Sequence, residues 1–157
     1  MATLRCVASL VLLALMGCSG EAATRDSTSG ADATSIIGTW EMIEFEITRG
    51  SETTRLTADP EPLALTVYTP DHFAYVWKGQ ANAGAGTYVF DGATIRQTFQ
   101  YLSDESLIGS VFTFRLDIEG DIMRFSGPLT AVSAAGDDIT ERIPQMVEVR
   151  RRIDSDQ

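Results

Sequence analysis

The sequence predicts an all-β domain, an eight-stranded antiparallel up-and-down barrel. From Trp40 onward, apolar and polar residues alternate with a period of two, and no sustained 3.6-residue apolar stripe indicates a helix. Short turn signals separate the alternating segments, which leaves a sandwich or a closed barrel. An immunoglobulin-type sandwich places its tryptophan on the third strand beside a cysteine pair. Here Trp40 lies on the first strand and both cysteines precede it, so the barrel is favoured.

The clearest strand covers residues 110–118. Its even positions from Phe112 to Ile118 are apolar and its odd positions from Thr113 to Asp117 are polar, as in a half-buried antiparallel strand. The turn at Gly120 predicts a tight hairpin to the next strand. In chain order, the same reading predicts strands over residues 40–48, 63–69, 72–78, 86–90, 94–102, 110–118, 121–126 and 145–153.

Two connections between these strands are notably longer than the others. Residues 49–62 and 127–144 are polar enough to form surface loops, with room for a short helical turn. Residues 79–86 are glycine-rich but lack the Lys-Ser/Thr ending of a phosphate loop, so a flexible loop at the barrel rim is expected.

The first strand changes its apolar parity. Trp40 and Met42 occupy even positions, whereas Ile43, Phe45 and Ile47 occupy odd ones. A β-bulge near Met42 would shift the inward set by one residue and reconcile the two groups.

Residues 1–17 resemble the signal peptide of a bacterial lipoprotein. Arg5 precedes an apolar run over residues 7–16, which is shorter than the roughly 20 residues of a membrane-spanning helix. The segment from Leu15 to Cys18 is similar to the lipobox, whose cysteine becomes the lipidated first residue of the mature chain. We therefore expect export and lipid anchoring in the bacterial cell envelope. The outer membrane, where one exists, is the expected destination, because Ser19 stands where an aspartate often directs inner-membrane retention.

The predicted organisation has three parts. Residues 1–17 form the signal peptide, and residues 18–35 hold the lipidated Cys18 and a flexible linker without aromatic or large aliphatic residues. Residues 36–154 form the barrel domain, since every aromatic residue of the chain lies between Trp40 and Phe125.

Composition excludes several classes of function. With 22 acidic and 12 basic residues, the chain has a net charge of −10, which opposes binding to nucleic acid and docking on anionic lipid through a basic patch. One histidine and two cysteines are too few for a zinc site built from those ligands. His72 follows Asp71 at a strand start, where turn residues are usually solvated, and the sequence has no nucleophile elbow. We predict no catalytic residue, no metal and no cofactor.

Gly38 and Trp40, at the head of the first strand, resemble the Gly-x-Trp signature of the lipocalins and of small lipocalin-like bacterial proteins. The likeness continues in order through residues 68–74, 84–88, 106–109, 119–121 and 148–152. The resemblance implies an eight-stranded barrel in a family with few assigned functions. That family often has a Tyr-Thr-Glu run in its fifth strand, where this chain has Gln97 in place of the glutamate. A role resting on that carboxylate is therefore not carried over.

Alternation predicts an apolar and aromatic interior. We expect Phe73, Tyr75, Trp77, Gln97, Phe99, Tyr101, Phe112, Phe114 and Phe125 to contact a ligand, with Ile95, Leu116 and Met123 also facing inward. This composition suits a small-molecule pocket, although the same side chains can simply fill an eight-stranded barrel.

A tryptophan on the first strand can plug the closed end of a small barrel, and an arginine from the last strand can lie across its ring. Val147, Val149 and Arg151 share one face of the last strand, so Arg151 is the predicted partner of Trp40. The alternative is a cluster of three solvated arginines at a C-terminal edge.

Three hypotheses of function follow. The leading one is a lipid-anchored, extracytoplasmic barrel that binds a small apolar or amphipathic ligand without changing it chemically. The second is a packed barrel that acts as a cell-envelope interaction module through loops 49–62 and 127–144. The third is an enzyme whose pocket polarises a substrate through Tyr75, Tyr101 or an arginine.

Overall fold

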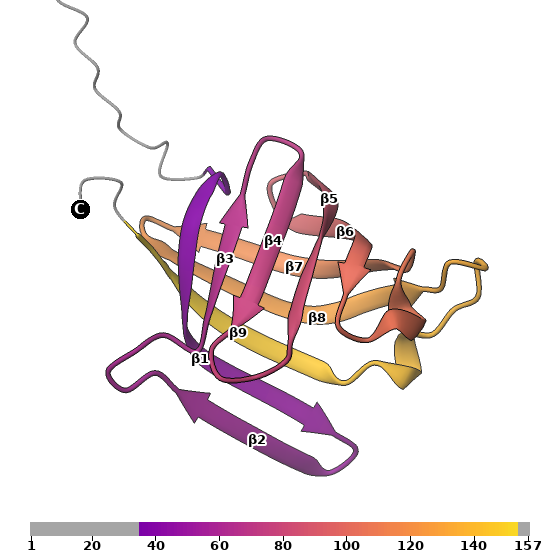
Figure 1. Cartoon of the computed structure of the whole chain (residues 1–157), viewed down its shortest axis with the longest axis horizontal. Coiled ribbons are helices and arrows are strands. Elements are labelled where there is room, and N and C mark those ends of the chain that lie inside the picture. Colours follow the sequence, from indigo (N-terminus) through magenta and orange to yellow (C-terminus); the bar gives the residue numbers. More distant parts are fainter. Residues whose placement is uncertain (1–34, 154–157) are drawn as a thin grey trace, which may run out of the picture.

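The computed structural model describes residues 35–153 as an antiparallel β-barrel (Figure 1). Its strands are β1 (Gly38–Arg49), β2 (Glu52–Thr57), β3 (Ala64–Tyr68), β4 (His72–Trp77), β5 (Ala83–Phe90), β6 (Thr94–Leu102), β7 (Val111–Glu119), β8 (Ile122–Val132) and β9 (Gln145–Arg152). Two short 3-10 turns are η1 (Glu105–Leu107) and η2 (Thr140–Arg142). Within these residues no helix has the length and apolarity needed to cross a membrane. The predicted signal peptide and Cys18 lie outside the described residues.

Eight strands close the barrel in sequence order, as predicted. β1 pairs with β3, each following strand pairs antiparallel with the next, and β9 pairs back onto β1. The β5–β6 turn shows how the sequence sets these hairpins. Gly92 adopts a positive φ, and the Asp91 carboxylate accepts hydrogen bonds from the backbone and side chain of Thr94 and from the Ala93 amide. These bonds lower the pKa of Asp91 to about 2.

A ninth strand lies outside the barrel, where residues 49–62 were predicted to form a loop. β2 forms a hairpin with the second half of β1, from the pair Glu44–Thr57 to the pair Arg49–Glu52 (Figure 1). All six residues of β2 are exposed, so the strand carries no apolar alternation that the sequence could reveal. The other long connection is shorter than predicted because β8 continues to Val132.

The predicted bulge in β1 is confirmed. The pairing with β9 shifts register between Met42 and Glu44. Trp40 and Met42 are buried before the bulge, and Phe45 and Ile47 line the interior after it. The irregularity therefore turns residues of both parities inward.

A second irregularity, in β6, corrects the prediction for Tyr101. Gly86 pairs with Phe99, but its neighbour Ala85 pairs with Tyr101, so the parity of β6 changes between them. Tyr101 is consequently 70% exposed, and Leu102 takes the inward position. The backbones of β5 and β6 approach each other very closely here, because a Cβ on Gly86 would lie 1.9 Å from the Thr98 carbonyl oxygen.

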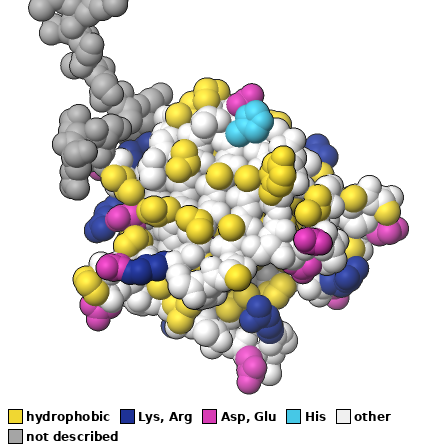
Figure 2. All heavy atoms as spheres, in the orientation of Figure 1, with side chains coloured by type: hydrophobic (Ala, Val, Ile, Leu, Met, Phe, Trp, Pro, Cys, Tyr) yellow, Lys and Arg dark blue, Asp and Glu magenta, His cyan; other side chains and the backbone are white. Residues whose placement is uncertain are grey.

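The outer face of β3 and β4 is apolar. Leu65, Val67 and Val76 are exposed there. Figure 2 shows uncharged side chains across the centre of this face and charged side chains around its edges. The only histidine, His72, is exposed, and its Nδ1 lies 2.7 Å from an Asp71 oxygen.

The closed end of the barrel is sealed by Trp40 and Arg152. Trp40 is fully buried and donates from Nε1 to the Ile36 carbonyl. The Arg152 guanidinium carbon lies 4.2 Å from the centre of the indole, and its Nη1 and Nη2 donate to the carbonyls of Ile37 and Ser35. Gly38 has φ +134°, and a Cβ there would approach Arg152 Nη1 to 3.1 Å. The glycine thus leaves room for the arginine.

The predicted pairing of Trp40 with Arg151 is wrong. Arg151 lies on the outer surface, where its Nη2 donates to Glu41 at 2.8 Å. The error has a simple cause, because the even positions of β9 face inward and these carry Glu148, Arg150 and Arg152. The solvated cluster of three arginines is also excluded, since Arg150 and Arg152 are buried.

Replacing Arg152 by Ala should lower the free energy of unfolding by about 2–3 kcal/mol, because it removes a buried cation–π contact and two hydrogen bonds. Arg151→Ala is the matched control and should change it by less than about 0.5 kcal/mol, since its ion pair is exposed. Urea unfolding followed by tryptophan fluorescence measures both values. Equal losses in the two variants would contradict the sealing role of Arg152.

Candidate ligand-binding site

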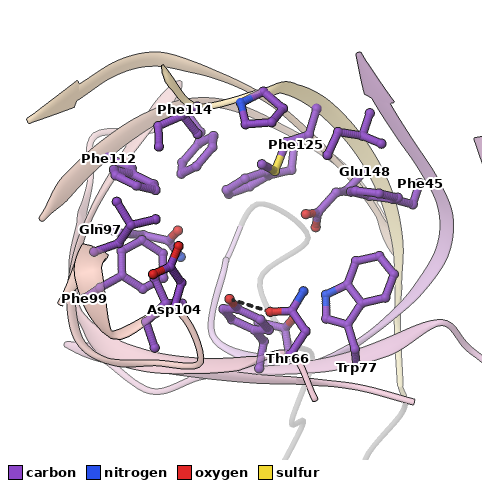
Figure 3. Close-up of a pocket in the computed structure, with 18 of the residues that line it drawn as sticks. Phe45, Thr66, Trp77, Gln97, Phe99, Asp104, Phe112, Phe114, Phe125 and Glu148 are labelled. Atoms are coloured by element: carbon purple, nitrogen blue, oxygen red, sulfur yellow. Dashed lines mark hydrogen bonds between the residues drawn. The ribbon is translucent and has the colours of Figure 1, made fainter. Parts of the chain in front are cut away.

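The barrel is hollow toward the end opposite Trp40. A cavity of about 430 Å³ opens there between the second half of β1, the start of β9 and the segments around η1 and η2. The cavity is lined by eight of the nine predicted ligand-contacting residues, namely Phe73, Tyr75, Trp77, Gln97, Phe99, Phe112, Phe114 and Phe125. Figure 3 shows these walls enclosing an open space. Tyr101 is the exception, because it points outward.

The cavity walls are built from contacting aromatic rings. Phe73, Phe99 and Phe112 form a continuous edge-to-face series with centroid separations of 5.3 and 5.2 Å. On the other side, Phe45 packs edge-on against Trp77 at 4.8 Å. Each such pair contributes about 0.5–1.5 kcal/mol beyond its buried area. The rings therefore hold one another in place and give the cavity a defined shape.

A buried ion pair lies in the wall formed by β9. Glu148 and Arg150 are 6% and 5% exposed. Arg150 donates from Nε and Nη2 to one oxygen of Glu148, Oε2, and from Nη1 to the Tyr68 hydroxyl at 2.8 Å. Its guanidinium carbon also lies 4.7 Å from the centre of the Phe125 ring. The carboxylate of Glu148 is directed into the cavity (Figure 3).

Sequence reasoning did not find this pair. Alternation and the usual exposure of charged residues place Glu148 and Arg150 outside a barrel. The one sequence feature that points to the pair is Met146, an apolar residue that shares the even positions of β9 with Glu148 and Arg150. The pattern is ambiguous because the odd positions carry Val147 and Val149, which are equally apolar.

Burial and nearby charges shift the pKa values of the titratable side chains in this region. Burial raises the pKa of Tyr75 to about 12, with a smaller contribution from the charge of Glu148. Burial also raises the pKa of Tyr68, against the opposing effect of Arg150. For Arg150 itself, burial acts to lower the pKa, but Glu148 and Tyr68 outweigh it, so that the pKa is raised. Arg150 is therefore a cation, compensated by its neighbour.

Gln97 lies inside the cavity. It is 4% exposed, and its Nε2 donates to the Tyr68 hydroxyl at 3.5 Å. The position therefore supplies an amide to the site and adds no charge. Within residues 35–153, no group of three or more His, Cys, Asp or Glu side chains is placed to hold a metal ion.

Strand pairing and the hollow interior define the chain as a closed eight-stranded up-and-down β-barrel with an aromatic cavity. No protein-family model and no curated protein matches the chain. Among solved structures, the crystal structure of Rv2717c from M. tuberculosis is similar over 75% of this chain and 92% of that chain, with 15% sequence identity and a TM-score of 0.29. That score is too low to support a conclusion, so the fold assignment rests on the strand pairings.

Replacing Glu148 by Leu should destabilise the barrel by about 3–5 kcal/mol, because Arg150 is left as a buried cation without a counter-charge. Arg150→Met should have a similar cost for the converse reason. The double variant should recover at least half of the summed losses, since no unpaired charge remains. Urea unfolding of the four proteins completes the cycle. Additive losses would mean that the two side chains do not act as a pair.

Proposed function

We propose that this protein binds a small apolar or amphipathic molecule inside its barrel and releases it unchanged. The cavity of about 430 Å³, walled by aromatic rings and open at one end, is the observation that carries the proposal. Small-molecule sites are typically apolar hollows of roughly 300–1,000 Å³ with a few placed polar groups. The resemblance to lipocalin-like bacterial proteins, which rests on the ordered motifs beginning at Gly38 and Trp40, is consistent with this role.

The two competing functions have less support. A packed barrel serving as an interaction module would fill its interior with side chains, whereas this interior is hollow. An enzyme acting through Tyr75, Tyr101 or an arginine has less support. Burial raises the pKa of Tyr75 to about 12, Tyr101 lies outside the cavity, and Arg150 is paired with Glu148.

Binding can be tested with N-phenyl-1-naphthylamine, a neutral apolar dye that fluoresces when it leaves water. The purified protein should bind one dye per chain. Leu102→Trp, which enlarges a side chain in the cavity wall, should weaken binding by about tenfold or more, equivalent to about 1.4 kcal/mol. Tyr101→Trp, one residue away on the outer surface, should leave it unchanged.

Protein purified from its native host supplies an independent check. Solvent extraction followed by mass spectrometry should detect a co-purifying small molecule that Leu102→Trp lacks. Failure of dye binding together with a repeatedly empty extract would contradict the proposed function.

The proposal also includes export and lipid anchoring through Cys18, which rests on the apolar run over residues 7–16 and the lipobox-like segment ending at that cysteine. In the native host, Cys18→Ser should move the protein from the membrane fraction to the soluble fraction or leave it uncleaved. Cys6→Ser is the matched control and should not alter fractionation, because Cys6 leaves with the signal peptide. Membrane association that survives Cys18→Ser with normal cleavage would rule out the anchor.

A further inference from the structure

Three buried polar side chains from three different strands face the cavity. They are Thr66 on β3, Gln97 on β6 and Glu148 on β9, and they are 2%, 4% and 6% exposed. Tyr68 links two of them, since its hydroxyl accepts from Gln97 and from Arg150, which is bound to Glu148. The three residues form one polar region within an otherwise aromatic wall, which we call the polar floor.

Most donor atoms around the polar floor already make a hydrogen bond within the protein. All three guanidinium nitrogens of Arg150 donate to Glu148 or Tyr68. The amide nitrogen of Gln97 donates to Tyr68, and the hydroxyl of Tyr75 donates to Asn82. A ligand acceptor would therefore compete with these internal bonds for most of the donors, with the Thr66 hydroxyl as the exception.

Acceptors, in contrast, remain available. Both bonds from Arg150 fall on Oε2 of Glu148, and within residues 35–153 its Oε1 has no hydrogen-bond partner. The same holds, across the part of the chain that the structure describes, for the amide oxygen of Gln97 and the hydroxyl of Thr66. Among the described residues, the fully buried side-chain polar atom without a partner is Nε of Arg152, so the three oxygens are accessible from the cavity and open to a ligand donor.

The charges around the polar floor further restrict which polar group a ligand can carry. A ligand carboxylate would face the carboxylate of Glu148 in a low-dielectric cavity, while the guanidinium of Arg150 is already compensated. A ligand ammonium would lose its hydration and meet a carboxylate whose charge is likewise balanced. A neutral hydroxyl loses little hydration and can donate to Oε1 of Glu148 while it accepts from Thr66.

We propose that the ligand is a neutral amphipathic alcohol, whose apolar body contacts the aromatic walls and whose hydroxyl donates to Glu148 on the polar floor. This inference rests on the proposed function and specifies the chemical class of molecule that the cavity selects. It assigns Glu148 to hydroxyl recognition and Thr66 to a supporting contact.

The test compares compounds that share one alkyl chain and differ at the polar end: dodecanol, dodecyl methyl ether, dodecanoate and dodecylammonium. Each compound is titrated against the N-phenyl-1-naphthylamine complex of the full-length protein at neutral pH, with the alcohol and ether below their solubility limits and the charged compounds below their critical micelle concentrations. Dodecanol should bind about tenfold more tightly than the ether, which lacks the donor, and more tightly than either charged compound. Equal binding of alcohol and ether, or tighter binding of dodecanoate, would overturn the inference.

The result also separates this inference from the proposed function. Saturable dye binding with no preference for the alcohol would leave the binding function in place and overturn its hydroxyl specificity. Absence of dye binding would overturn both.

Variants assign the preference to the polar floor. Glu148→Leu combined with Arg150→Met removes both charges, so the preference for alcohol over ether should fall to about twofold or less. Glu41→Leu combined with Arg151→Met removes the outward-facing ion pair between β1 and β9 and should keep the full preference. Thr66→Val, which preserves side-chain shape, should reduce the preference by a smaller factor. An unchanged preference in the Glu148→Leu/Arg150→Met protein, or an equal loss in the Glu41→Leu/Arg151→Met control, would contradict the assignment.

Discussion

The pairing of β1 with β9 is the contact on which the rest of the molecule depends. Without it the chain would form an open sheet with two exposed edges and no enclosed interior. The bulge after Met42 lets β1 bend while both of its halves stay paired with β9. At the end of this seam, the stack of Arg152 on Trp40 joins the last strand to the first. A cavity with fixed aromatic walls exists because these two strands meet.

Stability alone does not explain the buried charges on β9. Isolating an ion pair from water costs several kcal/mol per ion, and apolar residues of similar size often perform as well in a core. Glu148 and Arg150 nevertheless stand in a wall made of phenylalanine rings. Their geometry leaves one carboxylate oxygen directed at the cavity. In the proposed binding function, such a fixed acceptor would give the directional recognition that aromatic surface alone cannot provide.

The sequence was sufficient to predict most of the fold. Alternation located all eight barrel strands, and the parity conflict around Met42 located the bulge. The eight correctly placed cavity residues follow the same periodicity. The prediction for Tyr101 failed because the register shift opposite Gly86 depends on a close approach of two backbones. Such an approach leaves no mark in the pattern of apolar residues. The β2 strand escaped notice because it buries nothing.

The ion pair and the true partner of Trp40 were missed for a different reason. Pattern reasoning assigns valines inward and charges outward, but in β9 the charged Glu148, Arg150 and Arg152 are buried at even positions. Val147 is exposed, and Val149 is buried at an odd position. A buried arginine becomes favourable only when a carboxylate, a phenol or a carbonyl from elsewhere in the chain meets it. Tyr68 and Ile37, which supply such groups, are far from β9 in sequence. Only the three-dimensional fold brings them together.

The contacts of Arg152 also place both ends of the described chain at the same end of the barrel. Ser35 and Ile37, whose carbonyls accept from Arg152, lie at the N-terminal end of the described chain, and Arg152 lies at its C-terminal end. Both ends are therefore at the end of the barrel that Trp40 closes (Figure 1). The mouth of the cavity is at the opposite pole. A domain attached through its N-terminal segment would therefore present its entrance away from the point of attachment. A ligand would then exchange with the surrounding fluid. A pulling force on the N-terminal segment would act on the contact between Trp40 and Arg152 before it acted on the cavity walls.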